Sequence, residues 1–167
     1  MVFGSKNGFS TPLSLASLDG NNGFAINGIN SGDWSGGSVS DAGDINADGI
    51  ADVIIGAPNA NSAAGQTYVV FGSKNAFAHV LNLVSLDGNN GFNINGINAN
   101  DMSGYSVSKT GALDGNGING IFISAYQANN KAGQSYIVFA QGNAPVPTPT
   151  PTPAPTPTPT PVPTPIP

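Results

Sequence analysis

The chain has 167 residues and a formal net charge of −5, from nine aspartates and four lysines, with no glutamate or arginine. A negative chain without arginine offers no surface for phosphate groups, so nucleic acid is not expected as a partner. The absence of cysteine excludes a disulfide scaffold, a thiol nucleophile and a thiolate metal site.

Two copies of one unit make up most of the chain. Residues 1–68 and 69–136, aligned without a gap, share 39 identical positions. The shared runs include FGSKN, SLDGNNGF and INGIN. Because internal repeats decide the architecture, residues 1–143 are predicted to hold two repeats, 1–68 and 69–140.

Each unit contains four short segments with strand character, rich in β-branched or aromatic residues and bounded by glycine. They are 24–29, 36–42, 51–58 and 65–72 in the first unit, and 92–97, 104–110, 120–126 and 133–140 in the second. Residues 5–23 are interpreted as one long insertion in the blade. The predicted fold is all-β, with blades of four antiparallel strands as in a β-propeller.

The order of these segments predicts one complete blade flanked by two partial ones. Strands three and four of one blade come first, then all four of the next, then strands one to three of a last. Propellers typically need about four to eight blades, so further blades in cis or a homo-oligomer are expected. The leftover segment at 24–29 is also the strand missing from the last blade, which suits circular closure.

The segment SDAGDINADGIADVIIGAP contains a candidate metal-binding loop. Asp44, Asn46, Asp48 and Asp52 occupy positions one, three, five and nine, and the Ile50 carbonyl falls at position seven. Calcium takes about six to eight oxygen ligands, which closely spaced side chains in a turn can supply. Carboxylates held this close repel one another without a cation. The alternatives are an Asx-rich hairpin turn without metal and magnesium, which prefers to keep its water.

The aligned loop of the second unit has lost most of these oxygens. Asp44 is replaced by Ala112 and Asp52 by Gly120, while Asp114 and Asn116 remain. Lys109 replaces Asp41 and is expected to balance the negative charge of the remaining aspartate, Asp114. The second loop is therefore predicted to lack a strong metal site.

No catalytic group is predicted. His79, the one histidine, has no counterpart in the first unit and is interpreted as a surface loop residue. No nucleophile elbow occurs in a strand-to-helix setting. The run DGNNGF at Asp19 and Asp87 is interpreted as a turn, and the variable positions Trp34 and Tyr105 as repacking between blades or a recognition surface.

The last segment, residues 144–167, alternates proline mostly with threonine. It lacks the apolar side chains to offset its ordering entropy, so a disordered, polyproline-type linker is expected. No run of apolar residues approaches the length of a membrane span.

The residues GGSVSDAGDINADGIADVIIGAP followed by GQTYVVFG resemble the FG-GAP repeat, the blade unit of the integrin α N-terminal propeller and of many bacterial surface proteins. The resemblance implies a seven-bladed propeller, calcium in the hairpin between the first two strands, and a role in adhesion or extracellular recognition. The expected function is a calcium-binding, non-enzymatic repeat region of a cell-surface or secreted protein, with an extracellular protein or glycan as partner. The alternative is an accessory or carbohydrate-binding module of an exported enzyme, joined through the Pro/Thr linker.

Overall fold

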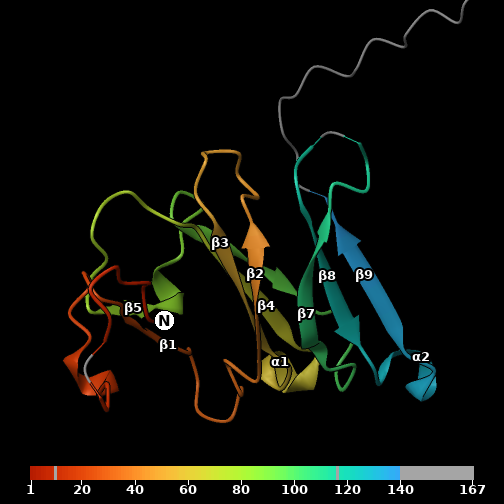
Figure 1. The fold of residues 1–167 in the computed structure, drawn as a ribbon. Helices are drawn as coiled ribbons and strands as arrows, with labels where there is room; N and C mark the ends of the chain where they lie inside the picture. The colour runs from red at the N-terminus through yellow and green to blue at the C-terminus, as the bar shows by residue number, and fades with distance from the viewer. Residues whose placement is uncertain (10, 116, 140–167) are drawn as a thin grey trace, which may run out of the picture.

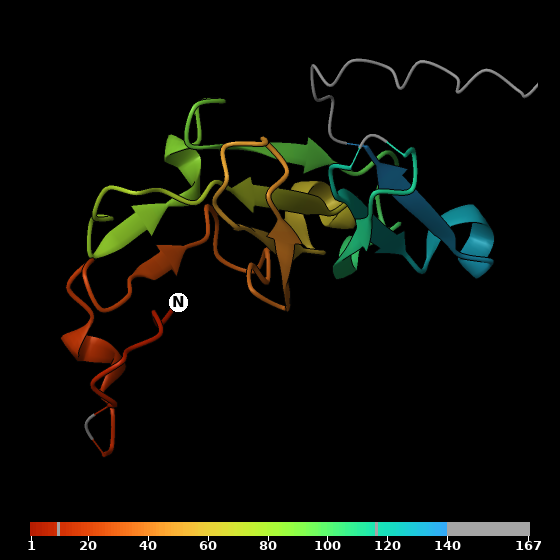
Figure 2. The same ribbon diagram turned by 45° about the horizontal axis from the view of Figure 1, so that its top comes forward.

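The computed structural model describes residues 1–9, 11–115 and 117–139, which form an all-β fold (Figure 1). The predicted boundary at residue 143 and the Pro/Thr linker lie outside the described residues. Within them, the N-terminal strands and the C-terminal sheet lie on opposite sides of a central sheet, as Figures 1 and 2 both show.

The central sheet is a complete four-stranded antiparallel blade. Its strands are β2 (Ser38–Gly43), β3 (Asp52–Ala57), β4 (Gln66–Val70) and β6 (Gly91–Asn95), paired in that order. The fourth strand comes from the second unit, as the strand order of the sequence predicts. Strands β3 and β4 are buried along most of their length, because sheets cover them on both faces.

The C-terminal sheet contains the first three strands of the next blade. They are β7 (Ser103–Gly111), β8 (Gly120–Ala125) and β9 (Gln134–Val138), again antiparallel. Among the described residues β9 pairs only with β8, so one edge of β9 is free. Exposed and half-buried residues alternate along the C-terminal part of β9, whereas its counterpart β4 is buried.

The N-terminal residues contribute part of a third blade. Strand β1 (Ala25–Asn27) is its fourth strand, and Val2 forms an isolated antiparallel bridge with Gly23 where the third strand would run. The other partner of β1 is β5 (Val80–Asn82), which pairs in parallel. Strand β5 lies in the second unit's counterpart of the insertion at 5–23, and this pair departs from the antiparallel pattern.

Short helical turns connect the strands. The 3-10 turns η1 (Leu15–Ser17) and η2 (Leu83–Ser85) occupy equivalent positions in the two units. Between the second and third strands of each blade lie α1 (Ala60–Ala63) and α2 (Ala128–Lys131), each with left-handed residues inside it. No helix within the described part of the chain combines the length and hydropathy needed to cross a bilayer.

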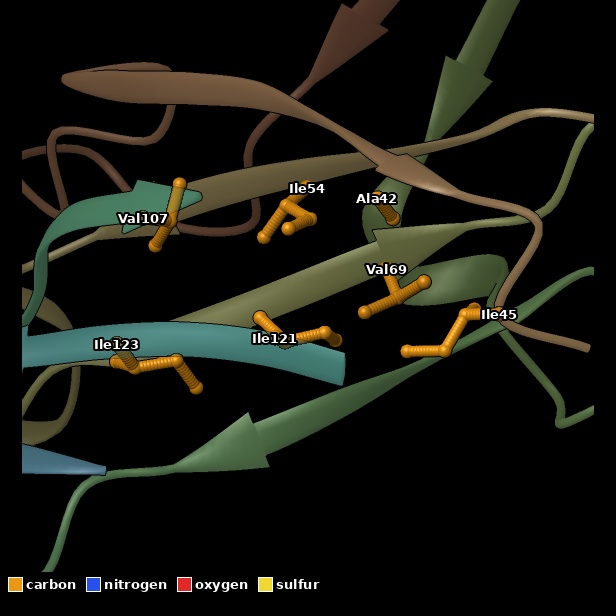
Figure 3. Close-up of a cluster of buried hydrophobic side chains, with 7 residues drawn as sticks. All are labelled: Ala42, Ile45, Ile54, Val69, Val107, Ile121 and Ile123. Atoms are coloured by element: carbon orange, nitrogen blue, oxygen red, sulfur yellow. The ribbon is translucent and has the colours of Figure 1, made fainter. Parts of the chain in front are cut away.

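The main core lies between the central and C-terminal sheets (Figure 3). The central sheet and its loop contribute Ala42, Ile45, Ile54 and Val69, and the C-terminal sheet contributes Val107, Ile121 and Ile123. A second cluster, which includes Ile55, Tyr68, Val70 and Leu83, covers the opposite face of the central sheet. The central blade is thus packed on both faces, which fixes the ends of β2 and β3 that carry the candidate loop.

Candidate metal site

The candidate loop connects β2 to β3 directly, as the sequence predicts. Gly43 at the end of β2 pairs with Asp52 at the start of β3, and the intervening residues form the loop. Gly49 has a φ of 86°, a conformation that glycine adopts without steric cost. Gly72 lies against the loop so closely that a β-carbon there would meet the Ala51 carbonyl oxygen at 2.5 Å.

Asp44, Asn46 and Asp48 turn their oxygens toward the backbone of the loop itself. Asp44 accepts hydrogen bonds from the N–H groups of Asp48 at 2.9 Å and Gly49 at 2.8 Å. The Asn46 amide accepts from the Asp48 N–H at 3.0 Å and donates to the Asp48 carboxylate at 2.9 Å. Asp48 in turn accepts from the Ile50 N–H at 2.8 Å. The first three predicted ligands are therefore brought together in one hydrogen-bonded turn.

Asp52 has a different environment, because its side chain is 1% exposed. One of its oxygens accepts the Ile45 N–H at 2.9 Å, and the other accepts the Gly72 N–H at 2.8 Å. It therefore ties the loop to the segment after β4. Spacing alone assigned Asp52 as a ligand and did not reveal this anchoring role.

Burial raises the pKa of the Asp52 carboxyl above its ordinary value. The N–H groups of Gly72 and Ile45 oppose the rise, and the nearby charges of Asp48 and Asp44 add to it. The charges of Asp48 and Asp44 therefore act on Asp52, and a cation bound near these carboxylates would relieve the repulsion.

The donor chemistry of this loop fits a hard cation such as calcium. Each carboxylate oxygen that accepts one N–H keeps a second lone pair for a ligand bond. Within residues 1–9, 11–115 and 117–139, however, no three His, Cys, Asp or Glu side chains form a group that could hold a metal ion as they stand. An ion in this loop would therefore also need oxygen ligands other than carboxylates, such as the Asn46 side chain and the Ile50 carbonyl, or a change in the position of the side chains.

The corresponding loop of the second unit has a different role. Ile118, its counterpart of Ile50, packs against the main core, and Asn119 lies over Gly43 at the start of the first loop. Asn116 lies outside the described residues. Lys109 forms an ion pair with Asp41 of the neighbouring blade, at 3.0 Å from Nζ to Oδ2. The sequence suggested that Lys109 balances the charge of the aspartate in its own loop. It did not predict this ion pair between equivalent positions of adjacent blades.

Asp19 and Asp87 lie in two equivalent turns, as the sequence predicts. Each carboxylate accepts backbone N–H groups two and three residues further along the chain. These hydrogen bonds hold the pKa of both carboxyl groups below the ordinary value. His79 is exposed, and its carbonyl accepts the Ala25 N–H beside the parallel pair β1 and β5.

An exposed tyrosine pair lies at one end of the C-terminal sheet. The rings of Tyr105 and Tyr126 have centroids 4.4 Å apart, and the two residues are 53% and 46% exposed. Gln127 donates a hydrogen bond to the Tyr126 hydroxyl at 3.0 Å. The equivalent residues of the first unit are Gly37 and Pro58. Sequence reasoning noted Tyr105 but missed Tyr126, although the same alignment shows its replacement of proline.

Comparison with known proteins links the loop to one repeat family. The family described as FG-GAP repeat matches residues 36–70, which include β2, the loop, β3 and β4. Over 98 residues the chain is 36% identical to a protein of Caenorhabditis elegans named Integrin alpha pat-2. That match covers 57% of this chain and 7% of the relative. The chain therefore corresponds to a small part of the relative's length.

Proposed function

We propose that this FG-GAP repeat protein binds one calcium ion in the loop of its complete blade and serves as a non-enzymatic propeller region for extracellular recognition or adhesion. The observation that supports calcium most is the collection of Asp44, Asn46 and Asp48 oxygens in one turn beside the buried Asp52. The likeness to the integrin chain supports an extracellular or cell-surface setting.

The side chains of Asp44, Asn46, Asp48 and Asp52 and the carbonyl of Ile50 would hold the ion. The ion supplies positive charge that neutralises the carboxylates, and it takes part in no reaction. Because Asp52 already joins the loop to Gly72 at 2.8 Å, drawing the other ligands toward it would fix the hairpin against the segment after β4. Binding energy would therefore appear as stability of the central blade.

Isothermal titration calorimetry tests the metal part of the proposal. Calcium is expected to bind to the metal-free chain, and magnesium to bind more weakly, because its octahedral shell is dehydrated reluctantly. The absence of binding by both ions, or a preference for magnesium, would contradict the proposal.

A second candidate function, carbohydrate binding, is favoured by the Tyr105–Tyr126 pair. Exposed aromatic rings can stack on the apolar face of a sugar, and the Gln127 amide can bond to its hydroxyl groups. A glycan array with the wild type and a Tyr105→Ala/Tyr126→Ala variant tests this. Binding lost in the variant supports a lectin role, whereas an array without bound glycans counts against it.

A further inference from the structure

The contact between the central and C-terminal sheets provides a template for a second contact of the same kind. On the first unit, the positions that face the next blade are almost completely buried: Ala42, Ile45, Ile54 and Val69. Their counterparts 68 residues later are Thr110, Leu113, Phe122 and Ile137. Leu113 is 60% exposed and Ile137 is 44% exposed. The outer face of the C-terminal sheet thus keeps a large apolar side chain at three of these four positions, with Thr110 in place of Ala42, and no described residues cover it.

The other side of that contact is repeated on the opposite face of the central sheet. Val107 is 6% exposed and packs against the central sheet, whereas its counterpart Val39 is 64% exposed. Val39, Val53 and Ile55 line a cavity of about 290 Å³ together with Ile26 and Met1. Only the partial N-terminal blade lies on this side among the described residues, which leaves Val39 uncovered.

Backbone hydrogen bonds at the contact follow the same repeat. The carbonyls of Ser62, Ala63 and Ala64, in and after α1, accept the N–H groups of residues 100, 102 and 103 in the next blade. Left-handed residues in α1 aim these carbonyls outward, and α2 has the same left-handed turn at Asn129 and Asn130. By the same repeat, the outward carbonyls at α2 correspond to the acceptors, and the N–H groups of residues 32, 34 and 35 correspond to the donors. These two sets could form the backbone hydrogen bonds of a second contact between blades.

The free edge of β9 has a matching strand in β1. Within the chain, β4 pairs with β6 so that Gln66 is opposite Asn95, and a shift of 68 residues places Gln134 opposite Asn27. Residues 1–3, Met-Val-Phe, resemble residues 137–139, Ile-Val-Phe, and they already hold the corresponding place on β1 through the bridge of Val2 to Gly23. A copy of β9 could replace them and extend the pairing along β1.

Charge complementarity identifies the blade that would dock. Asp41 and Lys109 occupy equivalent positions and pair across the contact within the chain at 3.0 Å. A first unit docked on the C-terminal sheet would again place an Asp41 beside Lys109. A second unit docked there would place lysine beside lysine, which is repulsive.

From this geometry we propose that the chain associates head to tail with a second copy of itself. The outer face of β7, β8 and β9 in one copy packs on the Val39 face of the next copy. Strand β1 of that next copy completes the partial blade as its fourth strand. The described residues of each copy then contribute two blades to the assembly.

Disulfide cross-linking tests the predicted strand register, because the native chain has no cysteine. Asn27 and Gln134 are both exposed, so cysteines at these positions should leave the fold intact. A mixture of Asn27→Cys and Gln134→Cys chains should form a disulfide-linked dimer under mild oxidation. The matched control is Ser135→Cys with Asn27→Cys, because adjacent strand residues point to opposite faces. Equal cross-linking of both pairs would overturn the proposal.

Sedimentation of the whole chain, with and without calcium, tests the interface itself. The wild type should form multimers, and Ile137→Asp should weaken association by roughly tenfold or more, because it places a charge in an apolar contact. The control Val84→Asp changes a residue that is 72% exposed on η2 and should associate like the wild type. Circular dichroism checks that both variants are folded. A wild type that stays monomeric at high micromolar concentration, or multimers that persist in folded Ile137→Asp, would overturn the proposal.

Discussion

Replacing Asp44 with alanine should remove the calcium-dependent part of the stability. The substitution deletes two loop hydrogen bonds, to the N–H groups of Asp48 at 2.9 Å and Gly49 at 2.8 Å. Since Asp44 is only half-buried, each bond should contribute about 1 kcal/mol, with or without the ion. Calcium at a hundred times its Kd adds about 2.7 kcal/mol, which in a chain of this size corresponds to roughly 5–11 °C in Tm.

Thermal unfolding in calcium and in EGTA separates these two contributions. The wild type should melt about 5–11 °C higher in calcium than in EGTA, and Asp44→Ala should melt at the same temperature in both. Asp114→Ala, in the second loop, is the matched control and should keep the calcium increment of the wild type. The reasoning is refuted if wild-type Tm does not respond to EGTA, or if Asp44→Ala retains the full response.

Three other predictions concern Asp52, Asp41 and the pair of turn residues Asp19 and Asp87. Asp52→Ala should lower the free energy of unfolding by about 2–5 kcal/mol even in EGTA, because two N–H groups lose a buried acceptor; urea denaturation showing no loss would contradict this. Asp41→Ala should lose the half-exposed pair with Lys109, worth at most about 1 kcal/mol, and the hydrogen bond from the Gly43 N–H at 2.8 Å, worth about 1 kcal/mol. High salt should abolish only the ion-pair part of this cost, and a loss that does not change with salt would argue against the pair. The lowered pKa values of Asp19 and Asp87 mean that their stabilisation is present above the ordinary value of 3.8 and is lost as the pH falls below it. Acid unfolding of the double asparagine variant should therefore depend less on pH below 3.8, and an unchanged acid profile would refute that assignment.

The blade strands were predictable because their patterns are local. Short β-branched runs such as Val53–Ile55, bounded by glycine, match the observed β3, and the repeat alignment transferred this assignment to the second unit. Strand β5 was missed because its three residues have no pattern of their own and its partner β1 lies 55 residues away. Its parallel pairing depends on a tertiary contact that sequence periodicity does not record.

The candidate site likewise has a local part that the sequence predicted and long-range contacts that it did not. The spacing of Asp44, Asn46 and Asp48 predicted that their oxygens meet in one turn, and local hydrogen bonds bring them together. The anchoring of Gly72 by Asp52 and the pairing of Lys109 with Asp41 join segments that are distant in sequence. Such contacts follow from the stacking of blades, which the spacing of residues within one loop does not determine.

Equilibrium dialysis against calcium measures the proposed site most directly. The wild-type chain should bind one tightly held ion, because one of its two loops carries the ligand set, and Asp44→Ala should bind none at the same free calcium concentration. A wild type without bound calcium, or an Asp44→Ala variant that binds as much as the wild type, would contradict the assignment of this loop as a calcium site.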